Sequence, residues 1–192
     1  MADSIAYASV SVKKKTTNAG RAKGKKNFIV FFKFDDVDYT RNEKGVRVTT
    51  LAMKGSAKPI GVYATDSTIK IYHTSEGDND AKGFLQHVEF EHPGTDEEIL
   101  EFINNNVNES LGAIVFNCDG TDAKIAGEPS TPLKFSKADS QDDKEADKNI
   151  INLASVLRGN TIGIIAKSLI PATDNAEINA ILGLTTTAQT GL

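Results

Sequence analysis

The pattern of apolar and polar positions at residues 83–118 predicts a strand, a helix and a second strand. A Pro-Gly pair at 93–94 interrupts the first strand, Thr95 is placed to cap the helix, and Glu98 follows three residues later as in a capping box. We therefore expect one amphipathic helix of roughly three to four turns that lies against a sheet. Apolar residues at helical spacing form its buried face: Ile99, Phe102, Ile103 and Val107.

Short apolar runs separated by turn residues predict β-strands on both sides of this unit. Residues 28–34 form a dense aromatic and aliphatic run, typical of a buried strand, and residues 5–12 alternate as a half-buried strand does. The run at 150–157 fits a helix or a strand, and its alternation slightly favours a strand. We expect a mainly β (α+β) fold, a β-sandwich or barrel with one central helix. Further strands are expected at 46–51, 60–64, 68–72, 111–117, 123–126, 133–135 and 161–166.

The length of 192 residues accommodates one substantial core, within which a second independent domain would be cramped. We expect a single β-sandwich domain over residues 1–170, including a basic loop or arm at 13–26, and a C-terminal extension over 171–192. Within that extension, residues 176–182 are expected to form a helical turn. Residues 136–149 are polar and carry many charges of both signs, which predicts a solvated loop.

The composition is that of an ordinary soluble protein, with 39% hydrophobic and 25% charged residues. No apolar run approaches the ~20 residues that a membrane-spanning helix needs, so we expect no membrane partner. The first residues lack the basic and then apolar pattern of a secretory signal, which favours synthesis in the cytoplasm.

Charge is distributed unevenly along the chain. Residues 13–26 contain seven cations and no acid, and subtracting them from the net charge of −4 leaves −11 on the remainder. An acidic group lies in the expected loop at 139–147, and a second lies at the expected hairpin tip with Glu76, Asp78 and Asp80. The basic arm of one copy can meet either of them on another copy in head-to-tail assembly. Binding of nucleic acid by the arm, or a simple solvated loop, are the alternatives. The candidate inter-subunit residues are Lys13, Lys14, Lys15, Arg21, Lys23, Lys25, Lys26, Asp139, Asp142, Asp143, Glu145 and Asp147.

No cluster of residues indicates catalysis, a cofactor or a metal. Residues 78–83 with Glu89 superficially match a calcium-binding loop, but Lys82 occupies a position that needs an oxygen ligand, and an acidic hairpin tip is the favoured interpretation. Cys118 is the only cysteine and has no base placed beside it in the sequence, so a small buried hydrophobe is expected there. Three histidines lack the spacing of a transition-metal site: His73, His87 and His92.

The order of these elements resembles that of the tail tube proteins of bacteriophages and related contractile-injection tubes. A β-sandwich carries one central helix after a His-Pro-Gly break, within residues 89–99, and a strand follows at 112–116. The passages at 125–133 and 151–159, separated by an acidic loop, are similar to the rest of such virion β-sandwich proteins. The resemblance covers about residues 5–168.

The resemblance implies that copies assemble into rings, hexameric as is usual in that family, whose sheets join into a continuous β-barrel around a lumen. Stacked rings would then form a conduit for DNA, which passes without specific binding. Residues 13–26 would be an arm or loop between successive rings, and the net negative remainder would suit a lumen that does not hold DNA.

We therefore expect a non-enzymatic virion structural protein, a tail tube subunit that works by self-assembly alongside other tail or head proteins of the virion. A capsid-decorating or other head-associated protein would use a similar sandwich. A small nucleic-acid-binding module would depend on the basic arm instead.

Overall fold

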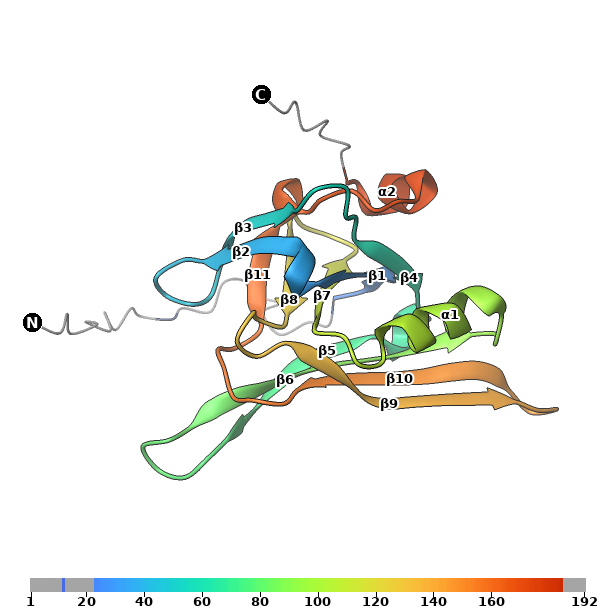
Figure 1. Ribbon diagram of the computed structural model, residues 1–192, viewed down its shortest axis with the longest axis horizontal. Coiled ribbons are helices and arrows are strands. Elements are labelled where there is room, and N and C mark those ends of the chain that lie inside the picture. Colours follow the sequence, from blue (N-terminus) through green and yellow to red (C-terminus); the bar gives the residue numbers. More distant parts are fainter. Residues whose placement is uncertain (1–11, 13–22, 185–192) are drawn as a thin grey trace, which may run out of the picture.

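Residues 83–117 form the strand, helix and strand that their pattern predicts: β6 (Gly83–Pro93), α1 (Glu97–Asn106) and β7 (Leu111–Asn117). The computed structural model describes Val12 and residues 23–184, so the strand expected at 5–12 lies outside the described residues except for Val12. The described part is mainly β, with two α-helices, which confirms the mainly β α+β class (Figure 1).

A central antiparallel layer contains, in order, β4, β1, β7, β8 and β11. The strands β1 and β7 lie in its middle, and the first six residues of β7 are all buried. Because both faces of these strands are covered, their sequences are continuous apolar runs and do not alternate. The bounds of the other strands are β1 (Lys25–Lys33), β4 (Ile60–Tyr63), β8 (Asp122–Ala126) and β11 (Gly163–Ala166).

One face of the central layer packs against α1 and against four further strands, which we call the outer sheet. Its order is β9 (Leu133–Asp142), β10 (Asp147–Ser155), β6 and β5 (Lys70–Glu76), and every neighbouring pair is antiparallel. The pairing of Leu111 with Leu133 joins the outer sheet to β7. The core between these layers includes Ile29, Phe31, Val88, Phe90, Ile99, Phe102, Val115, Ile151 and Leu153.

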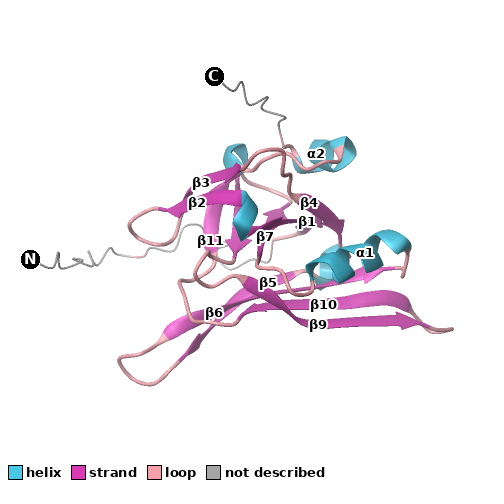
Figure 2. Cartoon of the chain, in the orientation of Figure 1, coloured by secondary structure: helices cyan, strands magenta, loops and turns pink. Residues whose placement is uncertain are grey.

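The opposite face of the central layer is covered by a two-stranded ribbon and a second helix. The ribbon consists of β2 (Val37–Arg41) and β3 (Val48–Met53), and the helix is α2 (Ala176–Leu182) (Figure 2). Leu182 and Leu184 are buried in the core on this side, together with Ile114 of β7. Leu182 and Leu184, within the range that was expected to be an extension, therefore pack onto the same central sheet as β7.

The prediction of a solvated loop at 136–149 is wrong. Most of this segment is a long hairpin of β9 and β10, and only residues 143–146 form its turn. Polar side chains hold the hairpin where apolar ones are absent: Asn149 is fully buried, its Nδ2 donates to Gly94 O at 2.7 Å, and its Oδ1 accepts from Ser140 Oγ at 2.8 Å. A polar strand of this kind carries no hydrophobic period, so the sequence pattern did not predict it.

The capping residue of α1 is Asp96 and not Thr95. Its side chain accepts a hydrogen bond from Ile99 N at 3.2 Å, and its extended backbone is that of an N-cap. Ile99 and Phe102 are buried as expected, whereas Val107 is 42% exposed because it follows the last helical residue and leaves the packed face. The expected helical turn at 176–182 is confirmed as α2, which Asn175 caps.

Candidate assembly surface

The outer sheet has two long edges that no described residue covers. At one edge, β5 pairs with β6 alone, and at the other, β9 pairs with β10 and touches β7 only through Leu133. Open edges of this length present rows of unpaired N–H and C=O groups, on which another chain can add a strand. Figure 2 shows that the two hairpins of this sheet extend toward opposite ends of the molecule.

The hydrogen bonds of β6 establish which amides point to these edges. Gln86 N donates to Ser155 Oγ of β10 at 2.9 Å, and Glu91 N donates to Thr68 Oγ1 beside β5 at 2.9 Å. Since alternate residues of a strand direct their amides to opposite sides, the register fixes the direction of every amide across the sheet. The outward amides on β5 are those of Ile71, His73 and Ser75, and those on β9 are those of Ala138, Ser140 and Asp142.

The face of the outer sheet that points away from the core is polar, and several of its charges are paired. Lys70 Nζ lies 3.2 Å from Glu89 Oε2, and Lys148 Nζ lies 3.0 Å from Glu91 Oε2. Tyr72 Oη donates to Glu89 Oε1 at 2.6 Å, and this hydrogen bond holds the pKa of Glu89 below its ordinary value. The ring of His87 stacks on that of Tyr72, with 4.8 Å between their centroids.

The predicted acidic residues all lie on the β9–β10 hairpin. Asp143 holds the turn by accepting from Glu145 N at 2.7 Å and Ala146 N at 3.0 Å, and the pKa of Asp143 is lowered, mainly by a hydrogen bond from the side chain of Gln141. Asp139 Oδ2 lies 2.9 Å from Lys137 Nζ.

Two carboxylates of the hairpin face each other directly. Asp142 and Asp147 are partners in the register of β9 and β10, and no ion pair to either is found among the described residues. Like charges directly opposite each other on paired strands are destabilising. This end of the hairpin is therefore the part of the predicted acidic group best placed to attract a cation from another molecule.

The predicted basic arm is shorter than expected, because β1 begins at Lys25. Lys25 Nζ donates to Asn117 Oδ1 at 2.7 Å, and burial lowers the pKa of Lys25. Lys26 Nζ donates to Ile181 O at the end of α2, and Lys23 Nζ lies 3.9 Å from Asp119 Oδ1. Lys25 and Lys26 thus have partners within their own chain, and the other four cations lie outside the described residues: Lys13, Lys14, Lys15 and Arg21.

The residues weighed for metal binding and nucleophilic chemistry do not converge. Asp80 lies in the tight β5–β6 turn with φ 67°, while His73 contacts Phe84, and Nδ1 of His92 lies 2.9 Å from Tyr63 O. Within residues 23–184, no group of three potential metal ligands gathers in one place. Cys118 is exposed, against the expectation of a buried hydrophobe, because it follows the last residue of β7.

The described helices include none that is both long and apolar enough to cross a membrane. The chain matches no protein-family model, no curated protein and no solved structure.

Proposed function

We propose that this protein is a virion structural protein, a tail tube subunit whose copies join into rings that stack to form a conduit for DNA. The observation that carries the proposal is the geometry of the outer sheet. One of its faces packs against the core, the other face is polar, and the strands at both edges have no strand paired on their outer side among the described residues. A subunit with two unlike open edges can bind a neighbour at each of them, and such head-to-tail contacts form a ring when the rotation from copy to copy completes a full turn.

Strand direction supports a cyclic arrangement. The outer sheet has four strands and all neighbouring pairs are antiparallel, so β5 at one edge runs opposite to β9 at the other. When copies are related by rotation about one axis, β5 of one copy therefore meets β9 of the next in antiparallel orientation. Every copy then adds four strands to one continuous barrel, without parallel pairing at the joints.

The charges of the polar face suit the wall of a conduit. Its carboxylates Glu89, Glu91 and Asp139 each lie within 3.2 Å of a lysine ammonium, so their charges are largely neutralised in place. A lysine that already forms an ion pair contributes less free energy to the binding of a phosphate. A polyanion that passes over such a face is therefore expected to bind it only weakly. The protein would act in the virion, after synthesis in the host cytoplasm.

Proline substitution at the two edges tests this proposal. Ala138→Pro removes an outward amide of β9, and Ser75→Pro removes one of β5; neither removes a hydrogen bond within the chain, so both variants are expected to fold. The matched controls Ala138→Ser and Ser75→Thr keep the amide. We expect rings or tubes of wild type and both controls in negative-stain microscopy, and neither proline variant should form them.

Mixing the two proline variants makes the test specific for unlike edges. Each variant keeps the edge that the other has lost, so an equimolar mixture should form dimers and stop there, as measured by sedimentation velocity. Dimers of one proline variant alone would indicate pairing of like edges and would contradict the ring. Small discrete oligomers of the wild type would favour a capsid-decorating role, and a wild type that stays monomeric at high concentration would overturn self-assembly.

A further inference from the structure

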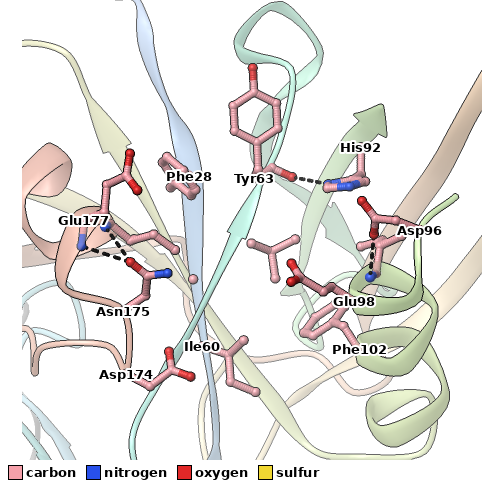
Figure 3. Close-up of a pocket in the computed structure, with 14 residues that line it drawn as sticks. Phe28, Ile60, Tyr63, His92, Asp96, Glu98, Phe102, Asp174, Asn175 and Glu177 are labelled. Atoms are coloured by element: carbon pink, nitrogen blue, oxygen red, sulfur yellow. Dashed lines mark hydrogen bonds between the residues drawn. The ribbon is translucent and has the colours of Figure 1, made fainter. Parts of the chain in front are cut away.

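A groove of about 510 Å³ lies along the outer edge of β4, between the N-terminal ends of α1 and α2 (Figure 3). Val62, Ile99 and Phe102 line the side toward α1, and Phe28 and Ile178 line the side toward α2. Gly61 lies between, where any Cβ would overlap the side chain of Ile178, so this strand approaches α2 closely.

Polar groups of the β4 edge point into this groove without partners in the described chain. Ala64 N donates to Asn27 O of β1 at 2.7 Å. The amides of Ala64 and Val62 therefore face β1, and those of Tyr63 and Gly61 face away from it. His92 Nδ1 lies 2.9 Å from Tyr63 O, which confirms the outward direction. The N–H and C=O of Gly61 and the N–H of Tyr63 are left for another strand, and Nε2 of His92 is buried without a partner.

The rim of the groove is acidic. Its lining contains four carboxylates and no Lys or Arg, and Figure 3 shows them on both sides of β4. A partner that fits must therefore be an extended, partly apolar strand with adjacent positive charge. The carboxylates are Asp96, Glu98, Asp174 and Glu177.

We propose that residues 5–15 of a second copy of this chain dock in the groove as a strand paired with β4. Residues 5–12 alternate in the manner of a half-buried strand, and three consecutive lysines at 13–15 follow them. Val12 is 99% exposed, so this apolar side chain is not packed against its own described chain. The proposal names a second contact between copies, separate from the edges of the outer sheet.

The path of the chain before β1 favours a neighbour over the same copy. Gly24 O accepts from Cys118 N at 2.9 Å, and Lys23 lies beside Asp119, so the chain enters β1 from the β7 side of the central layer. The groove lies beyond β4, on the opposite side of β1. The seven residues 16–22 that separate the docked segment from Lys23 span up to roughly 25 Å when extended, so the segment can extend away from its own chain toward an adjacent molecule.

Disulfide trapping in the full chain tests the proposal. In a Cys118→Ser background, one variant carries Val10→Cys and a second carries Ile60→Cys in the groove; the control for the second is Lys44→Cys in the turn between β2 and β3. We expect mild oxidation of the mixture to link Val10→Cys to Ile60→Cys at least about tenfold more than to Lys44→Cys, a difference of 1.4 kcal/mol. A yield no higher than that of the control would overturn the docking.

A single chain that carries both cysteines distinguishes the two possible sources of the strand. A dimer on a non-reducing gel supports exchange between copies, and a compact cross-linked monomer would overturn it. Reversing the groove charges with Glu98→Lys and Asp174→Lys should lower the yield, and Lys13→Glu with Lys14→Glu should restore it. Cross-linking should persist when Ala138→Pro and Ser75→Pro are added, so failure here and failure of ring formation are separate results.

Discussion

Arg41 Nη2 lies 3.4 Å from Glu128 Oε1, and both side chains are more than nine-tenths buried. The carboxylate also accepts from Gln86 Nε2 at 3.1 Å and from Asn160 Nδ2 at 2.9 Å, while Gln86 Oε1 accepts from Gly127 N at 2.7 Å. This network joins β2, β6 and two loops at one end of the outer sheet. It was not predicted, because its members are far apart in the sequence.

Removing one partner of this ion pair should strongly destabilise the fold. Glu128→Ala leaves the guanidinium of Arg41 buried without its counter-charge, at an expected cost of about 3–5 kcal/mol in the free energy of unfolding measured with urea. The exposed pair of Arg47 and Asp122 is the control, where Asp122→Ala should cost less than about 1 kcal/mol. Equal losses at the two sites would show that burial does not govern the strength of the first pair.

The hydrogen bond from Tyr72 to Glu89 predicts a pH dependence of stability. It lowers the pKa of Glu89 below 4.5 and raises that of Tyr72 above 10.0. A lowered carboxyl pKa stabilises the fold above the ordinary value, and this stabilisation is lost as the pH falls through the lowered pKa. The raised pKa of the Tyr72 phenol stabilises the fold below pH 10.0, and this stabilisation is lost as the pH rises through the raised pKa.

Tyr72→Phe isolates this contribution. Because both side chains are partly exposed, we expect a loss of only about 1 kcal/mol at pH 7. The difference from wild type, measured by urea unfolding, should be smaller at pH 2.5 than at pH 7, because the contribution of the hydrogen bond is lost as the pH falls through the lowered pKa of Glu89. A deficit that is the same at both pH values would mean that lost packing, and not the charged hydrogen bond, is responsible.

Gly112 in the middle of β7 gives a packing prediction. A Cβ at this position would overlap the ring of Phe32 on the neighbouring strand β1, inside a core that has no room for it. Gly112→Ala should therefore cost about 1–3 kcal/mol in unfolding free energy. Combining it with Phe32→Leu should cost less than the sum of the two single changes, and simple additivity would contradict the proposed overlap.

The sequence was sufficient to predict the elements whose buried residues form a continuous apolar run or recur with the period of a strand or a helix. The strands β1 and β7 are apolar on both faces, and β6 and α1 show the periods of a strand and a helix, so their positions follow from residues 28–34, 83–93 and 97–117 alone. For α1, Thr95 and Asp96 are both capping residues, and only the backbone geometry shows that Asp96 takes the role.

The candidate surface could not be predicted in the same way. A strand is open at its edge when nothing pairs with it, and pairing is a long-range property that no local pattern records. The full length of β9 could not be predicted either, because its outer half is polar. Pairing with β10 and the buried side chain of Asn149 keep that half in the sheet. The charges of Lys25 and Lys26 were visible, but their intrachain acceptors on β7 and α2 were not.

The facing carboxylates Asp142 and Asp147 are expected to lower the stability of the hairpin and to strengthen assembly. Asp142→Lys replaces a repulsion across the hairpin with an attraction, which should stabilise this end of β9 and β10 by about 0.2–1 kcal/mol. Slower amide exchange at residues 140–149 would measure that gain.

If these carboxylates attract the basic segment of a neighbour, the same change should weaken assembly, because natural surfaces give up stability for binding. Asp142→Asn is the matched control, with a smaller effect of the same sign on both quantities. Greater stability with unchanged assembly in the electron microscope would remove these two carboxylates from the contact between copies and leave the outward amides of β5 and β9 as its basis.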